Sequence, residues 1–361
     1  MVEQAVMCRV QAATSSDFSG SVKRLWWGVA VALVAVSAVL PRLGEALTWT
    51  RVEEVPVTDI FSLQRRGTIL YAGAADVVYI GANEGTNWSA TSSVDTAAVA
   101  VETVLPAGGA LWVRTFARGV YRSTNGGTSW DAVDTGLTGL GSEDVVELVE
   151  KSGHLYAASG GAGVFVLDLA APTQWSAFNA GFPVFTAGSV QDLVLHGTTL
   201  VGPAGANRFV YRFPEGATEW QEVAIVPPIA PGLLPTDLIA VGDDLFIGAP
   251  IGVYRSADDA QTWTFASDGL TRGTEVFLAA DGAVLFAGVD FLGNNHRLYR
   301  SADRGDSWQP IDEIPGAFLY ALEVAGDRLF AARADGLWWT PLATTGVRAA
   351  SWDELKSRFR K

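Results

Sequence analysis

The sequence predicts an all-β protein in which a unit of four short strands is repeated seven times. Seven of its 13 tryptophans recur at spacings of 39 to 45 residues, at Trp49, Trp88, Trp130, Trp175, Trp220, Trp263 and Trp308. A Tyr-Arg-Ser sequence precedes three of them, at residues 121–123, 254–256 and 299–301. No segment between residues 50 and 342 shows sustained helical periodicity. A period of this length is typical of β-propeller blades, each a four-stranded sheet.

The fifth repeat shows how the strands are expected to follow one another. Residues 236–241, 245–249, 252–256 and 263–266 are apolar or alternating runs, and Asp243, Asp244, Pro250 and residues 257–262 supply the turns between them. An apolar second strand recurs in every repeat, at residues 70–73, 111–113, 155–158, 200–202, 245–248, 285–288 and 329–332. Each repeat is therefore interpreted as one four-stranded blade.

The two ends of the repeat predict how the ring closes. Trp49 opens a strand with no other strand of its blade before it, and residues 318–341 provide three strands with no clear fourth. Placing the Trp49 strand in the last blade gives a seven-bladed propeller closed by its N-terminal strand. Closure removes the free sheet edge that would otherwise favour aggregation. Trp352 is placed outside the series, because the third strand around Trp338 would put the next tryptophan nearer residue 347.

The segment before the propeller is expected to direct export. Residues 25–40 (LWWGVAVALVAVSAVL) are apolar and uncharged and follow Lys23 and Arg24, which places residues 1–24 in the cytoplasm and the rest outside. Residues 25–46 are either a signal peptide, cleaved after residue 38 or 46, or an N-terminal membrane anchor; a buried core helix is the alternative. The protein is then periplasmic, extracellular or anchored to the cytoplasmic membrane facing outward.

A tail of residues 343–361 follows the propeller domain of residues 47–342. Ser351 and Glu354 form a capping box, and Trp352, Leu355 and Phe359 share one face of a short amphipathic helix. This helix either packs on the domain or binds a membrane surface or a partner.

Composition limits the possible ligands. Half of the residues are hydrophobic, enough for a large core, and a net charge of −14 argues against nucleic acid. One cysteine excludes a disulfide framework and a cysteine-rich metal site. Residues 50–342 carry 34 acidic and 16 basic residues, whereas the flanking segments carry 5 and 9. The acidic body would be repelled by anionic membranes, and the basic ends would not.

The turn before each repeated tryptophan follows the pattern Ser-x-Asp-x-Gly-x-x-Trp. The best copies are Ser301, Asp303, Gly305, Trp308; Ser123, Asn125, Gly127, Trp130; and Ser256, Asp258, Trp263. These copies resemble the Asp-box, or BNR, repeat of sialidase-like propellers, sortilin-type ectodomains and photosystem II assembly-factor propellers. The resemblance implies that the turn lies at the outer rim, on the face opposite the usual ligand site. The short acid can bond N–H groups of its own turn, and the tryptophan can pack between blades. A cation or sugar site at each acid is the alternative.

A ring of acids is the first candidate ligand site. Five of the seven first strands begin with an acid before an apolar residue, at Asp59, Asp144, Asp192, Asp237 and Glu275. First strands are innermost in a propeller, so these acids are expected around one end of the central channel. They would attract a cation, with calcium possible, or a cationic partner. Alternatively, each acid simply starts a strand and bonds its local turn.

Loop residues on the same face are the second candidate. The connection at residues 289–297 contains Asn294 and His296, and Arg114 and Arg118 occupy the corresponding region of the second repeat. Such mixtures of amide, aromatic and cationic groups are found in ligand pockets.

Two function classes remain open. The first is a non-catalytic binding or assembly platform for a protein or glycan. The second is a sialidase-like glycoside hydrolase that uses acids at the channel mouth. Sialidases of the resembled family carry an Arg-Ile-Pro motif, which this sequence lacks, and the three histidines lie in different repeats without metal-ligand spacing. We therefore assign no catalytic residue and no metal ligand, and favour the platform.

Overall fold

The computed structural model describes residues 47–95, 100–116, 118–137, 145–182, 190–204, 209–225, 234–291, 296–314, 316 and 318–342. They belong to a compact unit that spans Ala46–Val347. The apolar segment 25–46, the tail 343–361, Asp144 and Asn294 lie outside the described residues. Among the residues described, no helix is long and apolar enough to cross a bilayer.

The described strands form seven antiparallel sheets of four strands each. Blade 1 consists of β2 (Ser62–Arg66), β3 (Ile69–Gly73), β4 (Val78–Ala82) and β5 (Asn87–Ala90), and blade 2 of β6 (Val101–Ala107), β7 (Ala110–Thr115), β8 (Gly119–Ser123) and β9 (Asp131–Ala132). Blade 3 consists of β10 (Val145–Lys151), β11 (His154–Ser159), β12 (Gly163–Asp168) and β13 (Ser176–Ala177). Blade 4 consists of β14 (Val194–His196), β15 (Thr199–Ala204), β16 (Phe209–Phe213) and β17 (Gln221–Ala224).

Blades 5 to 7 complete the series. Blade 5 consists of β18 (Asp237–Val241), β19 (Asp244–Ala249), β20 (Gly252–Ser256) and β21 (Thr264–Phe265). Blade 6 consists of β22 (Glu275–Asp281), β23 (Val284–Asp290), β24 (His296–Ser301) and β25 (Gln309–Ile314). Blade 7 consists of β26 (Leu319–Ala325), β27 (Arg328–Arg333), β28 (Gly336–Pro341) and β1 (Thr50–Arg51). The predicted seven-bladed propeller is confirmed.

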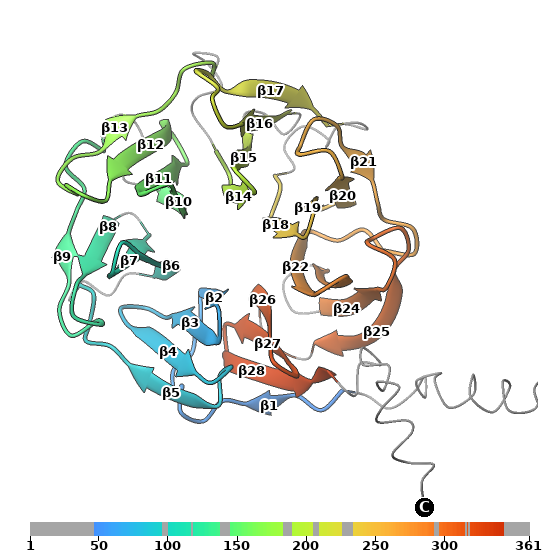
Figure 1. Cartoon of the computed structure of the whole chain (residues 1–361). Helices are drawn as coiled ribbons and strands as arrows, with labels where there is room; N and C mark the ends of the chain where they lie inside the picture. Colours follow the sequence, from blue (N-terminus) through green and yellow to red (C-terminus); the bar gives the residue numbers. More distant parts are fainter. Residues whose placement is uncertain are drawn as a thin grey trace, which may run out of the picture. The chain divides into compact units, whose positions relative to one another are not determined.

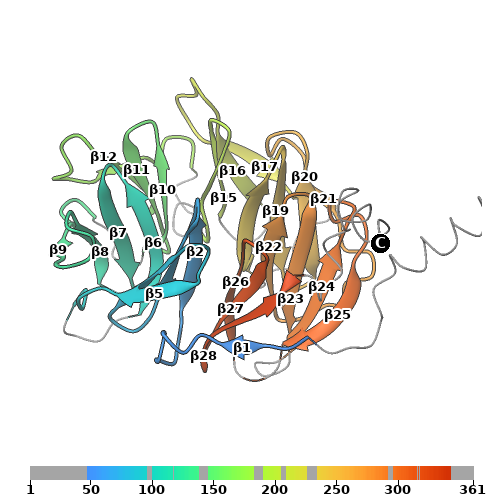
Figure 2. The same ribbon diagram turned by 60° about the horizontal axis from the view of Figure 1, so that its bottom comes forward.

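The blades surround a central axis, and the first strand of each blade is innermost (Figures 1 and 2). The closure predicted from Trp49 is also confirmed. β1 pairs antiparallel with β28, with Thr50 opposite Trp339 and Arg51 opposite Trp338. The last blade is thus built from both ends of the domain, in the order β1-β28-β27-β26.

The fifth blade shows how closely the sequence pattern locates strands. Its third strand, Gly252–Ser256, has the expected bounds, and its first two begin within one residue of expectation. The fourth strand is shorter than expected, at Thr264–Phe265. The pattern therefore locates inner strands better than the outer strand, which bonds to one neighbour and is solvated on its other edge.

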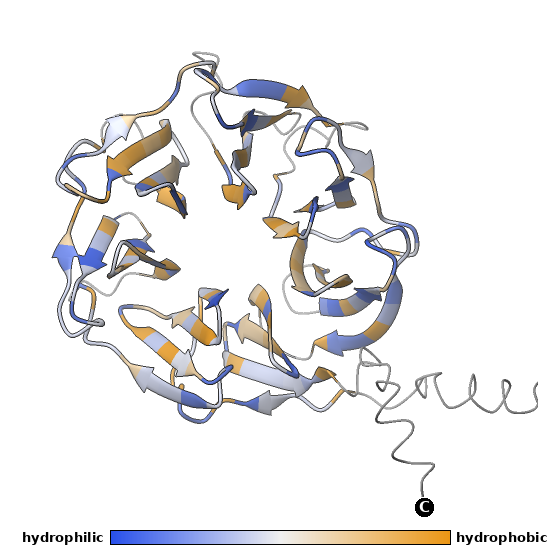
Figure 3. Cartoon of the chain, viewed as in Figure 1, coloured by the Kyte–Doolittle hydropathy of each residue, from blue (hydrophilic) through white to orange (hydrophobic). Residues whose placement is uncertain are grey.

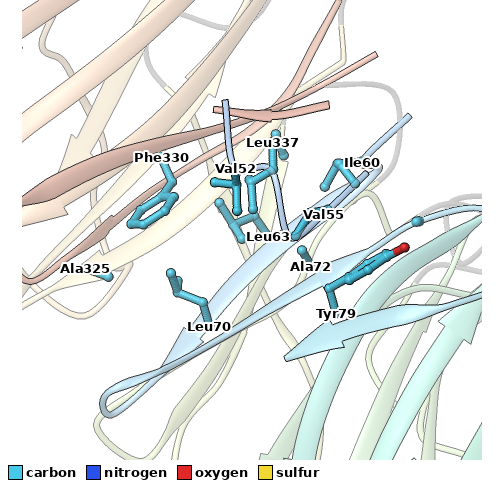
Figure 4. Packing of buried hydrophobic residues seen from close by; sticks show 12 residues of the cluster. Val52, Val55, Ile60, Leu63, Leu70, Ala72, Tyr79, Ala325, Phe330 and Leu337 are labelled. Atoms are coloured by element: carbon cyan, nitrogen blue, oxygen red, sulfur yellow. The ribbon is translucent and has the colours of Figure 1, made fainter. Parts of the chain in front are cut away.

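The hydrophobic core lies between blades. Hydropathy colouring shows apolar residues along the inner and middle strands, whereas the outer strand β17 at the rim is hydrophilic in its first half and apolar in its second (Figure 3). One cluster joins Leu63 and Leu70 of blade 1 to Phe330 and Leu337 of blade 7, all of them buried (Figure 4). Each blade covers the apolar face of the next, and the N-terminal strand completes the last blade of the ring.

The repeated tryptophans connect neighbouring blades. The indole N–H groups of Trp175, Trp220 and Trp308 donate to the backbone oxygens of Val133, Phe178 and Ala266, at 2.7, 2.8 and 2.9 Å. Each acceptor lies 42 residues earlier in the chain, on the preceding blade. These three side chains are at most 3% exposed. Each therefore combines apolar packing with one hydrogen bond across a blade boundary.

Candidate functional site

The strand order gives the propeller two different faces. On one face, which we call the connection face, the first strand of each blade begins. The loops between second and third strands lie on the same face. The hairpins between first and second strands and the turns between third and fourth strands lie on the other, which we call the turn face. This arrangement follows from the antiparallel order of every blade.

The turns with the Ser-x-Asp pattern lie on the turn face. In blade 6, Ser301 Oγ donates to Asp303 Oδ1 at 2.7 Å, and the Gly305 N–H donates to Ser301 Oγ at 2.8 Å. The Ser307 N–H donates to Asp303 Oδ1 at 2.9 Å. Ser123, Asn125 and Gly127 in blade 2 and Ser256, Asp258 and Ala260 in blade 5 repeat these bonds. The acid's oxygens are directed into its own turn.

The residue after each acid has a left-handed backbone and contacts the preceding blade. Asp259, at φ 59°, accepts hydrogen bonds from Thr199 at 2.7 Å and Arg212 at 2.6 Å. Arg304, at φ 60°, donates from Nε to Asp244 at 2.6 Å. On the turn face, charged pairs therefore connect blade 5 to blade 4 and blade 6 to blade 5.

A central channel of about 800 Å³ runs between the innermost strands. Its wall includes residues from the first strand of every blade, among them Leu63, Leu105, Leu148 and Ile239. Its ionisable side chains are the acids Glu102, Glu147, Glu150, Asp192, Asp237 and Glu323 and the bases Arg65, Arg66 and Arg114. Among these groups acids outnumber bases two to one, so the charge of the channel depends on how many of the acids are ionised.

Several channel acids also hydrogen-bond to the backbone, both in their own strand and across blade boundaries. Asp237 Oδ2 of blade 5 accepts the Leu278 N–H of blade 6 at 2.6 Å. Asp192 accepts the Leu193 N–H at 2.6 Å and also bonds the backbone of Leu238 in blade 5. These hydrogen bonds therefore connect neighbouring blades of the ring.

A second set of contacts surrounds Glu147. Its Oε2 accepts the hydroxyl of Thr103 at 3.1 Å, and its Oε1 accepts the Leu148 N–H at 3.0 Å. Arg114 donates to the same Thr103 hydroxyl at 3.3 Å and pairs with Glu102. A series of polar side-chain contacts thus connects blade 2 to blade 3 along the channel wall.

Burial makes these acids hard to ionise. It raises the pKa of Asp237 to about 7 and that of Glu323 to about 7, in each case against opposing backbone hydrogen bonds. Burial, then the charges of Glu147 and Asp237, raise the pKa of Asp192 well above its ordinary value. Burial also raises the pKa of Glu147, which Arg114 opposes. The channel therefore holds two carboxyls, Asp237 and Glu323, that change charge near neutral pH.

The predicted acids divide between the channel wall and its mouth. Asp192 and Asp237 line the wall. Asp59 and Glu275 lie near the phenol of Tyr320, whose pKa is raised first by burial and then by these two acids. Tyr320 contacts Phe61 with ring centroids 5.3 Å apart at the connection face. Four of the five predicted acids are thus at one end or on the wall of the channel.

Four channel acids were not expected from the sequence: Glu102, Glu147, Glu150 and Glu323. Glu147 is the third residue of β10, and Glu323 is the fifth residue of β26. The search for acids at strand starts did not include them. An acid within an otherwise apolar inner strand is the signal that would have found them.

The other predicted site residues lie in different surroundings. Arg114 belongs to strand β7, not to the loop after it, and lines the channel. Arg118 is half exposed near Asp95, at 3.9 Å. His296 starts β24, is 1% exposed, and its Nε2 accepts the Leu319 N–H at 3.1 Å. Burial, with the Arg333 charge, lowers the pKa of His296 against the effect of Asp290.

Exposed apolar side chains gather on the connection face. Four large hydrophobic residues are notably exposed in the part of the chain that is described: Phe116 (58%), Phe318 (48%), Leu234 (46%) and Phe265 (43%). Phe116 follows β7, and Leu234 and Phe318 precede β18 and β26, which places all three on the connection face. Phe265 lies in the outer strand β21.

The described residues contain no group of three or more His, Cys, Asp or Glu side chains placed to hold a metal ion. The channel acids are instead spread over several blades, and the bonds described above direct their oxygens to backbone N–H groups.

The sequence has no match among family models or curated proteins. Its fold is similar to several solved propellers. YCF48 from Cyanidioschyzon merolae has a TM-score of 0.61 and 16% identity over 81% of this chain and 98% of that one. A YCF48 structure bound to D1 peptide gives 0.62 and 16%, over 84% and 99% of the two chains.

Two further structures show how widely the fold is used. The GH74 enzyme of Niastella koreensis has a TM-score of 0.59 and 12% identity, over 81% of this chain and 53% of that one. The extracellular domain of BT4673 from B. thetaiotaomicron gives 0.63 and 11%, over 81% and 40%. At these identities the similarity establishes the fold alone: the chain is a seven-bladed β-propeller of the architecture found in both binding proteins and enzymes.

Proposed function

We propose that this protein is an exported or membrane-tethered, non-catalytic propeller that binds a protein partner on its connection face. The observation that carries the proposal is the placement of Phe116, Leu234 and Phe318. Three exposed apolar side chains lie on the connection face of a strongly acidic domain, one each in blades 2, 5 and 7. Exposed aromatic and aliphatic side chains on one face are typical of protein-binding surfaces.

The charge of the site indicates the chemistry of the partner. The whole chain has a net charge of −14, and the channel wall carries twice as many acids as bases. Asp59 and Glu275 add negative charge at the mouth near Tyr320. A partner segment with lysine or arginine next to aromatic or aliphatic residues would complement both features. The YCF48 structure with a bound D1 peptide supports peptide recognition by this architecture.

The described chain contains a matched control for this proposal. Phe318 and Phe265 are both exposed phenylalanines, but Phe318 precedes the innermost strand β26, whereas Phe265 lies in the outer strand β21. A displayed library of random peptides is selected on the purified protein, and the affinities of the enriched peptides are measured by calorimetry. We expect basic, aromatic peptides whose affinity falls about tenfold or more in Phe318→Ser and is unchanged in Phe265→Ser. Enrichment of acidic peptides, or equal loss in both variants, would contradict the proposal.

Export is tested separately. Fractionation of cells that express the full chain, followed by mass measurement, distinguishes a shortened soluble protein from a full-length membrane-bound one. A full-length protein in the cytoplasmic fraction would contradict this part of the proposal without affecting the peptide experiment.

One observation favours a second function, a glycoside hydrolase. Asp237 and Glu323 have pKa values raised to about 7, as suits a general acid. The GH74 enzyme is an example of this architecture in a hydrolase. Turnover of fluorogenic glycosides that is lost in Asp237→Asn would favour this function over the platform.

A further inference from the structure

A second pocket, separate from the channel, lies at the boundary between blades 6 and 7. It has a volume of about 450 Å³. Its wall includes Trp49, Gly316, Arg333, Asp335 and Trp338. The proposed function uses none of these residues, so the inference below goes beyond it.

Arg333 is the central group of this pocket. Its side chain is only 3% exposed, and Nη2 donates to Asp335 Oδ2 at 2.5 Å. The guanidinium carbon lies 4.9 Å from the ring centre of Trp338. Its Nε and Nη1 atoms are buried and have no hydrogen-bond partner among the described residues. Buried N–H donors of a charged group are costly when unpaired, so they indicate a missing acceptor.

The two indoles add donors to the same wall. The Nε1 atoms of Trp49 and Trp338 are buried and likewise have no partner in the described structure. At the equivalent position of other blades, Trp175 and Trp220 donate this N–H to the preceding blade. Trp49 occupies the same place in the repeat without that bond. Among the described residues, the pocket wall thus carries unpaired N–H donors of Arg333 and of two indoles, together with one unpaired carboxylate oxygen, Asp335 Oδ1.

A glycine allows the guanidinium to occupy this position. A Cβ added to Gly316 would lie 2.3 Å from Arg333 Nη2, and Gly316 has φ +98°, in the region that favours glycine. The close backbone and the Trp338 ring restrict the orientation of the guanidinium. A group held in this way loses little entropy when it binds a ligand.

We propose that this pocket binds a small monocarboxylate with a flat apolar body. The carboxylate accepts hydrogen bonds from the free Arg333 and indole N–H groups, and the apolar body lies against the tryptophans. Asp335 already neutralises part of the Arg333 charge, so a singly charged ligand suits the site better than a doubly charged phosphate. The same chemistry is offered by a free aromatic acid or by the C-terminus of a peptide.

The test uses the full chain with 4-fluorobenzoate as probe and 4-fluorobenzamide as its neutral analogue. Binding is followed by fluorine NMR of the probe and by calorimetry. We expect the carboxylate to bind in the millimolar range or tighter, and the amide at least about tenfold more weakly. A hydrophobic tripeptide with a free C-terminus, compared with its amidated form, shows whether a peptide can supply the carboxylate.

Three variants locate the site. Arg333→Met should abolish carboxylate binding, and Trp338→Phe, which keeps the ring but loses the N–H, should weaken it several-fold. Arg328→Met is the matched control, because the Arg328 guanidinium stacks at 4.3 Å on Trp339 of the same blade, outside the pocket. If Arg333→Met does not fold, two other measurements test the site: the loss of affinity in Trp338→Phe, and the ratio of the affinities for the carboxylate and the amide probe.

Several results would overturn the inference. Equal affinity for acid and amide would show that the charge is not recognised. Equal loss in Arg328→Met and Arg333→Met would show that binding does not occur in this pocket. No binding of either probe up to about 10 mM would remove the site. Each of these results leaves the peptide-binding proposal for the connection face unaffected.

Discussion

Replacing Asp237 by asparagine should stabilise the propeller at neutral and alkaline pH. Burial raises the pKa of this carboxyl from 3.8 to about 7, and Glu323 and Glu147 add to the effect. The folded protein therefore holds a proton that the unfolded chain releases. The stability contributed by protonated Asp237 is fully present below about pH 4 and is lost as pH rises through about 7. Asparagine stays neutral at every pH and keeps an oxygen for the Leu278 N–H.

The size of the effect follows from the pKa difference. Each pKa unit corresponds to about 1.4 kcal/mol, so the whole difference corresponds to about 4 kcal/mol at pH 8. Asp237 borders the open channel, where water screens its charge, and we reduce the expected gain to about 2 kcal/mol. At pH 4 the variant and the parent should differ by less than about 0.5 kcal/mol, because Asp237 is then neutral in the folded protein and only about half ionised in the unfolded chain.

The assay is chemical denaturation of both proteins between pH 4 and 8, followed by tryptophan fluorescence. The gain in midpoint should grow steadily with pH. Asp258→Asn is the control of opposite sign, because hydrogen bonds from Thr262, Ser256 and Gln261 outweigh burial and lower the Asp258 pKa. That variant should lose stability at neutral pH. A gain in Asp237→Asn that does not depend on pH, or a loss at pH 8, would refute the reasoning.

Three further predictions concern contacts between and within blades, each measured as the change in free energy of unfolding at pH 7. Trp220→Phe removes the bond to the Phe178 oxygen at 2.8 Å and should cost about 1 kcal/mol; no change would show that packing alone matters. Arg304→Ala leaves the buried Asp244 with fewer donors and should cost about 1 to 3 kcal/mol, and the loss should shrink in Asp244→Asn. Asp303→Ala opens a turn closed by the Ser307 N–H at 2.9 Å and should cost about 1 kcal/mol without changing peptide affinity; reduced peptide affinity would assign this turn a direct part in binding.

The fold could be predicted because its signals are local and repeated. A tryptophan recurs once in each blade, and a wrong assignment in one repeat is corrected by six others. Closure followed from the same logic, since Trp49 has no blade of its own unless it joins residues 318–341. The pairing of Thr50 with Trp339 shows that counting strands was sufficient.

The site could be predicted only in part, because it is formed by residues that repeat imperfectly. Acids at strand starts identified Asp192 and Asp237 but not Glu147 and Glu323, which lie inside β10 and β26. The pocket at Arg333 depends on a residue without an equivalent in the other repeats. A search for periodic patterns finds the residues that all blades share. A ligand site is instead formed by residues that occur in only one or two blades.

The channel acids connect stability to binding. Asp192 and Asp237 hydrogen-bond across blade boundaries, and burial raises the pKa of both. Glu147 and Asp237 add to the effect on Asp192, and Glu323 and Glu147 add to the effect on Asp237. A cationic side chain entering the channel would favour their ionised form, so its binding must release protons near neutral pH. The affinity of a basic peptide should therefore rise as pH increases through about 7, and calorimetry in buffers of different ionisation enthalpy should detect the released protons. Asp237→Asn should reduce both effects. Proton-neutral binding would mean that the peptide contacts the rim of the connection face and leaves the channel acids as purely structural groups.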